Sequence, residues 1–362
     1  MPKHQCSMLR MIPLGEAGAR AGVEQAESQP PVDADSGVGV RRRGLLAAKP
    51  VGVVAVVALV LLVLAFASWA YAQGASQFLM ISLNGVTYAA QLFLVASGLT
   101  LIFGVLRVVN LAHGSLYLLG GYLGFTVLAD SNNWWLGLLV GTAIAAACGL
   151  ALQQGVLRWM PADDLRQALA TIGVSVVAAD QLLAHFGGLT YSLTPPGSIT
   201  GSVNLHLLSV NYPAFRLAEL GLSFLVGLGL WALLKHTRTG VLVRAGVDDE
   251  KMLAALGVNV QAVFAFVFTL GAALAGLGGV VGGTALSIAP GDDDKYLLLS
   301  LVVVIVGGMG SITGAALGSL LVGLLQQYGL GYFPTYASVL TFGLLVVVLA
   351  VRPRGILGGQ SV

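Results

Sequence analysis

The sequence predicts an all-α membrane protein, a polytopic bundle of roughly 9–10 transmembrane segments in which some helices are broken or re-entrant. Of its 362 residues 57% are hydrophobic and only 9% are charged, and the mean hydropathy is +0.88. Long apolar runs recur along the chain, each of a length that can cross the hydrocarbon layer of about 30 Å. Several of these runs contain isolated polar residues, which favours helices interrupted at membrane depth.

The N-terminal part of the chain differs in composition from the rest. Residues 1–48 mix Gly, Ala, Ser, Pro and charged residues without a period, which predicts a disordered extension before a membrane domain over 49–362. The basic run 41–43 precedes an apolar run at 51–67 and the sequence Ala-Tyr-Ala at 70–72. This layout fits a cleavable signal peptide, but the apolar run is also long enough for an uncleaved anchor, which we favour.

The remaining apolar runs are the candidate membrane segments. They lie at about 78–106, 111–129, 134–157, 168–187, 214–234, 262–288, 296–309, 312–330 and 335–351. The run at 296–309 is short for a span, and we expect either a span or a re-entrant segment paired with its neighbour.

The distribution of Lys and Arg predicts the orientation. If the basic run 41–43 is inside, then the loops 158–166 and 235–251 and the tail 352–354 are cytoplasmic as well. The loops on the other side contain Lys295 as their single basic residue. The sequence therefore predicts a multi-pass membrane protein with these loops on the cytoplasmic side.

Polar residues interrupt the first long runs at 107–113. Asn110 and His113 lie three residues apart on one helix face, directly after Arg107. A buried polar group without a partner costs on the order of 2–7 kcal/mol, so these side chains need hydrogen bonds. We expect the helix to break here, with Asn110 and His113 bonding backbone carbonyls across the break.

Three further ionisable residues lie within apolar runs. Asp180 either faces a wet cavity or bonds to a neighbouring helix, and its neighbours Gln181 and His185 favour a structural hydrogen-bond cluster. Arg216 and Glu219 are three residues apart, a spacing that predicts a local ion pair.

The longest charged segment after the extension is 234–263. Its residues Met252, Leu253, Leu256 and Val260 form an apolar stripe at helical spacing, and the sequence at 257–259 is typical of a helix end. We therefore expect a short amphipathic cytoplasmic helix. Its apolar face would suit a groove on a partner protein or the lipid headgroups, and the sequence leaves both open.

Glycine-rich stretches point to packing rather than to nucleotide binding. The pairs Gly120/Gly124 and Gly314/Gly318 have the spacing of close helix contacts. In the sequence no lysine follows a glycine, so the phosphate-binding loop pattern is absent, and the stretch 306–324 predicts a tight turn or an unwound helix. The acidic cluster at 292–294 is expected on the outer side, as a solvated loop or as a contact for a binding protein.

The sequence lacks the residue patterns of enzymes, metal-binding proteins and nucleic-acid-binding proteins. It contains no evident catalytic triad, carboxylate pair or metal-ligand cluster, and its two cysteines do not have metal-ligand spacing. A net charge of +2 does not favour nucleic acid as a partner. We therefore expect a non-catalytic protein without cofactor or metal.

Four stretches together resemble one family. They are "LNGVTYAAQLFLVASGLTLIFGVLRVVNLAHGSLYLLGGYLG", in which Asn84-Gly85 is expected to open a helix, "TRTGVLVRAGVDDEKMLAALGVN", "GGMGSITGAALGSLLVGLL" and "RPRGILG". In this order they resemble the permease subunits of bacterial ABC importers for branched-chain amino acids, a family that also includes urea and short-amide permeases. The sequence departs from the family pattern at Thr313 and near Leu299, which puts the substrate in doubt.

The resemblance implies a permease of the bacterial inner (plasma) membrane that forms the translocation path of an ATP-driven importer while partner subunits hydrolyse the ATP. The implied partners are cytoplasmic ATP-binding subunits, a second homologous permease in a heterodimer, a periplasmic substrate-binding protein and membrane lipid. The implied path and helix-break residues are Asn84, Asn110, His113, Gly114, Gly307, Gly308 and Gly310. The implied coupling residues, within about 235–261, are Thr237, Arg238, Gly240, Arg244, Asp249, Leu256 and Gly257.

Two alternatives to a branched-chain amino acid importer stay open at this point. The first is a urea or short-amide permease of the same family. The second is an ion-coupled secondary transporter or channel, in which Asp180 and His113 would titrate during transport. A secondary transporter does not need a docking segment for cytoplasmic ATPases, so the segment 235–261 favours the importer.

Overall fold

The computed structural model describes residues 68–69, 71–72, 74–160, 163–205, 210–248 and 250–358. All of them belong to the compact unit Val63–Val362. The predicted extension 1–48 and the apolar run 51–67 lie outside the described residues, so the choice between signal peptide and anchor stays a prediction.

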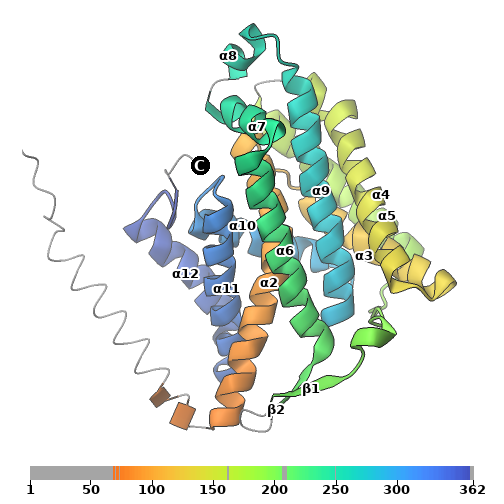
Figure 1. Cartoon of the computed structure of the whole chain (residues 1–362), viewed down its shortest axis with the longest axis vertical. Helices are drawn as coiled ribbons and strands as arrows, with labels where there is room; N and C mark the ends of the chain where they lie inside the picture. The colour runs from red at the N-terminus through yellow and green to blue at the C-terminus, as the bar shows by residue number, and fades with distance from the viewer. Residues whose placement is uncertain are drawn as a thin grey trace, which may run out of the picture. The chain divides into compact units, whose positions relative to one another are not determined.

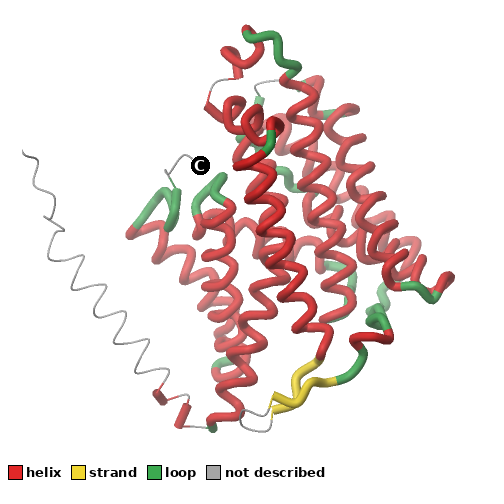
Figure 2. The backbone as a smooth tube through the Cα atoms, in the orientation of Figure 1, coloured by secondary structure: helices red, strands yellow, loops and turns green. Residues whose placement is uncertain are grey.

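The described chain is a bundle of α-helices, as predicted (Figures 1 and 2). A two-stranded antiparallel hairpin, β1 (Ser202–Leu205) and β2 (Val210–Pro213), leads into α6. The helices are α2 (Ala75–Leu106), α3 (His113–Ser131), α4 (Trp134–Gly155), α5 (Asp164–Phe186), α6 (Ala214–His236), α7 (Arg238–Asp248), α8 (Glu250–Ala255), α9 (Val260–Ala285), α10 (Asp292–Gly307), α11 (Ile312–Tyr332) and α12 (Ala337–Val351).

The predicted first run at 51–67 lies outside the described residues, so the membrane-crossing helices can be compared only for the rest of the chain. Among the described residues six helical segments are long and apolar enough: α2, α4 with the following turn, α5, α6, α9 and α12 with the turn before it. The pair α10 and α11 is apolar enough only when both helices are taken together, and the chain bends by 117° between them, so the pair is either a seventh, broken span or a re-entrant loop. This bend agrees with the expected re-entrant pairing. α3 does not qualify, because its glycines, tyrosines and His113 make it less apolar.

Helix α2 forms the centre of the bundle. It packs against α6, α9, α10 and α11, and 83% of its most apolar window is buried. The predicted small-residue contacts are present: the backbone of Gly120 lies against Gly276 of α9, and that of Gly318 lies against Val303 of α10. Small residues at these points let the helix backbones approach closely.

The two ends of the bundle differ in character. The hairpin lies at one end, and α7 and α8 lie at the other, with α6 running between them (Figure 1). Aromatic rings gather where α2 begins: Trp69 lies 5.4 Å from Tyr332, and Phe78 lies 5.8 Å from Tyr328. Such aromatic clusters are typical of the membrane–water interface.

Candidate functional site

The predicted helix break lies between α2 and α3. α2 ends at Arg107, which has a left-handed backbone (φ 57°), and α3 begins at His113. Asn110 accepts a hydrogen bond from the backbone N–H of Ala112 (3.1 Å), and Nε2 of His113 donates to the carbonyl of Val95 (2.9 Å). The expected carbonyl bond therefore exists for His113, whereas Asn110 bonds a backbone N–H within its own turn.

The break is buried inside the protein. Asn110 and His113 are both fully buried, and among the described residues Nδ2 of Asn110 and Nδ1 of His113 have no hydrogen-bond partner. Gly114 lies against the backbone of Asp293 at the start of α10, so closely that a side chain at position 114 would overlap it. Two helix N-termini, those of α3 and α10, therefore meet beside the middle of α2.

The acidic cluster at 292–294 is only partly solvated and lies in the first turn of α10, which corrects the expectation of a solvated loop. Asp293 is 5% exposed, and Asp292 accepts a hydrogen bond from the backbone of Ala289 (2.9 Å) and pairs with Lys295 (3.4 Å). The physical reason is the helix start: acidic residues in the first turn of α10 are held by local bonds and by packing against α3.

Gly307, Gly308 and Gly310 form the turn between α10 and α11. The C-terminal tail pairs with the end of α10, because Ile356 N–H donates to the carbonyl of Val306 (2.9 Å) and Leu357 N–H donates to that of Gly307 (3.0 Å). These bonds satisfy carbonyls at the end of α10 that have no partner within the helix. The turn and the tail "RPRGILG" are therefore one packed unit, although they lie 45 residues apart in sequence.

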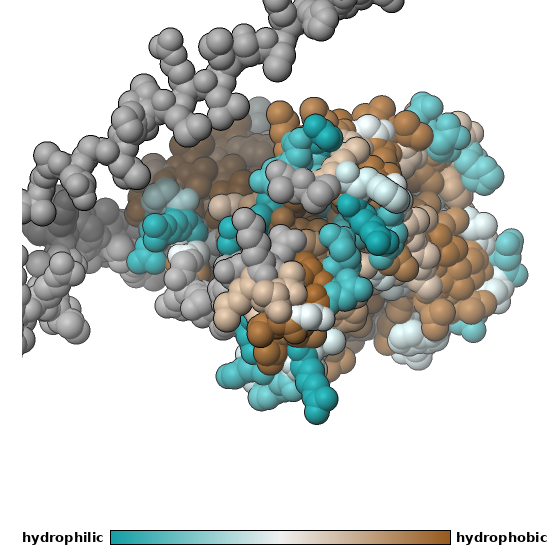
Figure 3. All heavy atoms as spheres, turned by 90° about the horizontal axis from the view of Figure 1, so that it is seen from above, coloured by the Kyte–Doolittle hydropathy of each residue, from teal (hydrophilic) through white to brown (hydrophobic). Residues whose placement is uncertain are grey.

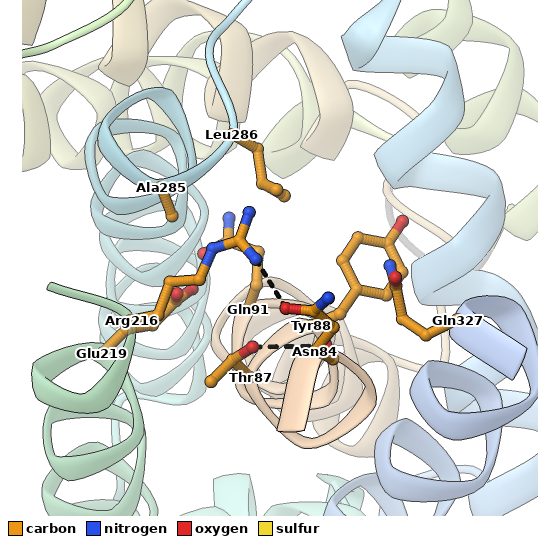
Figure 4. A pocket seen from close by; sticks show the side chains of 9 residues that line it. All are labelled: Asn84, Thr87, Tyr88, Gln91, Arg216, Glu219, Ala285, Leu286 and Gln327. Carbon is orange, nitrogen blue, oxygen red and sulfur yellow. Dashed lines mark hydrogen bonds between the residues drawn. The ribbon is translucent and has the colours of Figure 1, made fainter. Parts of the chain in front are cut away.

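Asn84 lies in a polar cavity beside the N-terminal half of α2. It does not open a helix as expected, because α2 already begins at Ala75. The cavity has a volume of about 140 Å³ between α2, α6, α9 and α11 (Figure 4). Its lining residues are Asn84, Thr87, Tyr88, Gln91, Arg216, Glu219, Ala285, Leu286 and Gln327.

A hydrogen-bond network fixes one side of this cavity. Oδ1 of Asn84 accepts from the Arg216 guanidinium (2.7 Å) and from the hydroxyl of Tyr212 (3.0 Å), and that hydroxyl also lies 2.8 Å from Oγ1 of Thr87. The predicted ion pair of Arg216 with Glu219 is wrong: no salt bridge joins these two described residues, since Asn84 holds the guanidinium instead.

On the other side of the cavity, two acceptor oxygens lack a hydrogen-bond donor. Glu219 is 3% exposed, and among the described residues its Oε1 accepts no hydrogen bond. Gln91 is fully buried and donates to the carbonyl of Gly278 (2.8 Å), but its Oε1 likewise has no partner there. Two residues of the cavity lining therefore each carry a buried acceptor oxygen without a donor.

The spacing of the polar residues in α2 is the sequence feature that indicates this site. Asn84, Thr87 and Gln91 are spaced i, i+3 and i+7, so they lie on one face of an otherwise apolar helix. Tyr212 and Gln327 come from remote parts of the chain and had no such signal. The structure brings Asn84 into this cavity and leaves the other six predicted path residues outside its lining.

The predicted coupling segment consists of two helices, not one. Thr237 caps α7, because its Oγ1 accepts from the N–H of Gly240 (3.0 Å) and bonds the carbonyl of Leu233 (2.5 Å). Arg244 donates to the carbonyl of Leu234. α7 is therefore fastened to the end of α6 at several points, whereas Arg238 is exposed and Asp249 lies outside the described residues.

Gly240 makes the attachment of α7 to α6 possible. A side chain at this position would overlap the backbone carbonyls of Leu233 and Leu234. A residue without Cβ is therefore needed where the two helices meet.

α8 ends as predicted at Gly257. This residue has a left-handed backbone (φ +81°), the N–H of Gly257 bonds the carbonyl of Ala254 (3.0 Å), and the N–H of Val258 bonds that of Leu253 (3.3 Å). This pair of bonds is the Schellman arrangement, in which glycine is favoured.

The predicted apolar stripe is interrupted between the end of α8 and the start of α9, because the chain turns at Gly257. Leu253 is 3% exposed and Val260 is buried, whereas Met252 and Leu256 are 61% and 70% exposed. Seen from the end that carries α7 and α8, apolar side chains alternate with hydrophilic ones (Figure 3). Met252 and Leu256 therefore form an exposed apolar surface at this end of the bundle.

Helix α5 has a polar inner face and an outer face without neighbours. Its inner face bonds the region of the break, through Thr171 to the N–H of Leu111 (3.2 Å) and through Ser175 to Ser115 (2.7 Å). Asp180 is exposed on the other side, where the described residues provide no hydrogen bond. The expected cluster of Asp180 with Gln181 and His185 is therefore wrong, because all three side chains point outward and are exposed.

The described residues do not contain a group of three His, Cys, Asp or Glu side chains that could hold a metal ion. The candidate site consists of a polar cavity, a buried helix break and the short helices α7 and α8 at the end of α6.

Comparison with known proteins gives a family profile and several relatives that are named for branched-chain amino acid transport. Residues 81–349 match the family profile described as "Branched-chain amino acid transport system / permease component". The chain is 30% identical over 300 residues to the high-affinity branched-chain amino acid transport system permease protein BraD of Pseudomonas aeruginosa, covering 79% of this chain and 97% of the relative. It is 29% identical over 306 residues to the permease protein LivH of Escherichia coli K12, with the same coverages. A probable LivH of Methanocaldococcus jannaschii is 26% identical over 300 residues, which cover 77% and 92% of the two chains.

Proposed function

This chain belongs to the family of branched-chain amino acid transport system permease components, and from that premise we propose that it forms the translocation path for branched-chain amino acids in an ATP-driven importer of the inner membrane. The observation that supports this most is the match itself, which runs over nearly the full length of relatives named for this transport. The same names disfavour the urea and short-amide alternative.

The energy for transport comes from cytoplasmic ATP-binding subunits, which dock on α7 and α8. The exposed apolar side chains Met252 and Leu256 support this, because a short helix with an apolar face suits a groove on a partner protein. An ion-coupled transporter would have no use for such a surface. In this proposal the chain itself does not hydrolyse ATP.

Helix α6 joins the docking surface to the polar cavity. Its C-terminal end is bonded to α7 through Thr237 and Arg244, and its N-terminal part carries Arg216 and Glu219 into the cavity. With 23 residues, α6 is about 34 Å long at 1.5 Å per residue. A movement of α7 on nucleotide binding would therefore reach the cavity through one continuous helix.

A second permease covers the outer face of α5 in this proposal. Apolar side chains such as Leu169, Val176 and Val177 are exposed along this face, and Asp180 lies among them. A carboxylate that faces lipid within a membrane helix costs about 2.5–3.5 kcal/mol or more. A partner subunit that supplies a donor to Asp180 removes this cost, which lipid chains cannot do.

The remaining predicted path residues have a supporting role in the same proposal. Asn110, His113 and Gly114 hold the break between α2 and α3 against α10, and Gly307, Gly308 and Gly310 hold the α10–α11 turn. Irregular backbone at membrane depth is tolerated where it is packed within protein or lines a cavity. The outer end of the bundle, at the hairpin, is the surface for a periplasmic substrate-binding protein.

The experiment that tests this function is purification of the tagged full-length chain from its native membrane, with mass spectrometry of the proteins that accompany it. We expect two ATP-binding proteins and a second permease, and ATP hydrolysis by the purified assembly. A chain that purifies alone, without ATPase activity, would overturn the proposal.

A further inference from the structure

The cavity beside Asn84 combines the Arg216 guanidinium, which is hydrogen-bonded to Asn84, with two buried acceptor oxygens that lack donors. From this we infer that it is a binding site for the charged ends of a free amino acid, with the α-carboxylate on Arg216 and the α-ammonium on Glu219 and Gln91. The inference rests on the proposed function and deepens it, because it places a recognition site for the transported zwitterion within the permease itself.

The acceptor side needs a donor that the described chain does not supply. Oε1 of Glu219 and Oε1 of Gln91 are buried and have no hydrogen-bond partner among the described residues. Buried polar groups in proteins nearly always have a partner, and a buried carboxylate needs one most. An ammonium group has three donors and a positive charge, which is the chemistry that these two oxygens lack.

The cation side is arranged to receive a carboxylate. Arg216 has five N–H donors, and the structure assigns one of them to Oδ1 of Asn84 at 2.7 Å. Tyr212 donates to the same oxygen and so fixes Asn84 in place. In Figure 4 the guanidinium extends into the space between Asn84, Leu286 and Gln91. An arginine with a fixed orientation can bind a carboxylate through two parallel hydrogen bonds.

The remaining walls suit an apolar side chain. Ala285 and Leu286 come from the end of α9, and the ring of Tyr88 comes from α2. The rest of the lining is polar, so these residues give the cavity a small apolar part beside its convergent polar groups. The cavity volume of about 140 Å³ limits the occupant to a small solute, so a free amino acid fits this chemistry and a peptide does not.

The same site offers different groups to the two ends of the ligand, which makes the inference testable with simple analogues. The probes are L-leucine, 3-methylbutylamine, which lacks the carboxylate, and 4-methylpentanoate, which lacks the ammonium group. Equilibrium binding of each radiolabelled probe is measured on the full-length chain in lipid nanodiscs, for the wild type and for the variants Glu219→Gln and Arg216→Gln. The matched control is Arg166→Gln, since Arg166 lies in an exposed ion pair with Asp163 outside the cavity.

The expected pattern separates the two ends of the ligand. Glu219→Gln should weaken leucine binding about tenfold to a hundredfold, the usual effect of losing a hydrogen bond to a charged group. It should weaken binding of the amine as well but leave the carboxylate unchanged. Arg216→Gln should weaken binding of leucine and the carboxylate but leave the amine unchanged. Arg166→Gln should bind all three probes like the wild type.

Three results would overturn the inference: no leucine binding to the wild-type chain, equal binding by all variants, or a uniform loss for all probes, which would mark a structural effect only. Leucine uptake by cells with and without this chain is measured in parallel. If uptake depends on the chain but binding does not follow the expected pattern, then the inference fails and the proposed function stands. If uptake does not depend on the chain, then the proposed function fails first.

Discussion

Nε2 of His113, at the start of α3, donates a hydrogen bond to the carbonyl of Val95 in the middle of α2. The two residues are 18 positions apart, and between them the chain leaves α2, turns at Arg107 and returns to mid-helix. The bond also assigns the ring proton to Nε2, since a carbonyl can only accept. The His113 side chain thus connects the start of α3 to α2, the central helix of the bundle.

We predict that His113→Leu lowers transport while leaving the assembly with ATP-binding subunits intact. The loss of a buried hydrogen bond costs about 1–3 kcal/mol, so thermal unfolding of the purified variant should begin at a lower temperature. His113→Gln keeps a donor and should lose less. Leucine uptake at the wild-type rate by His113→Leu would show that this bond is not needed for transport.

We predict that Gly240→Ala uncouples the importer. The new methyl group would overlap the carbonyls of Leu233 and Leu234, so α7 must move from the end of α6. Overpacking of this kind costs about 1–3 kcal/mol, enough to lower ATP-driven uptake about tenfold or more.

Gly229→Ala in α6 is the matched control for this substitution, because no atom of the described chain lies within 4 Å of the added Cβ. Leucine uptake by this variant should equal that of the wild type, and the substitution should stabilise the helix by about 0.5–1 kcal/mol. Equal uptake by both variants would contradict the attachment of α7 as the coupling element.

We predict that Gly308→Ala releases the C-terminal tail. Gly308 has φ +108°, and a side chain there would overlap the backbone at Leu357 and Gly358. Backbone strain at such a position costs about 1–3 kcal/mol for other residues. Limited trypsin digestion should therefore cut after Arg354 faster than in the wild type. The control Gly343→Ala in α12 has open space around it among the described residues, and its digestion should not change.

We predict that Asp180→Leu reduces the amount of second permease that purifies with the chain. If a partner subunit supplies a donor to Asp180, then an apolar side chain leaves that donor buried without an acceptor, at a cost of about 1–3 kcal/mol. Asp130→Leu is the control, because Asp130 is exposed near the end of α3. Quantitative mass spectrometry of the purified assemblies gives the ratio of the two permeases, and an unchanged ratio for Asp180→Leu would argue for lipid at this face.

The helices were largely predictable because hydrophobic runs depend on local sequence alone. The expected run 134–157 corresponds to α4 at Trp134–Gly155, and the expected run 262–288 corresponds to α9 at Val260–Ala285. The end of α8 at Gly257 was predictable for the same reason, since glycine is favoured at a left-handed helix end. The bend between α10 and α11 followed from the short run before it.

The polar contacts were less predictable because their partners lie far away in sequence. The spacing of Arg216 and Glu219 indicated a local ion pair, but Asn84, more than a hundred residues earlier, takes the guanidinium. Likewise, Asp180 was expected to bond its own helix neighbours, and its actual exposure depends on which helices α5 contacts. Local spacing gives candidate partners, but tertiary packing decides among them.

In the proposed function, ATPases docked on α7 and α8 drive a branched-chain amino acid permease. The most direct measurement is the initial rate of leucine uptake by cells whose own copy of the gene is deleted, after complementation with the wild type or with Gly257→Trp. We predict that the wild type restores uptake, whereas Gly257→Trp does not although it reaches the membrane, because a left-handed backbone at position 257 disfavours any side chain. Uptake that is independent of this chain, or that Gly257→Trp restores fully, would contradict the account.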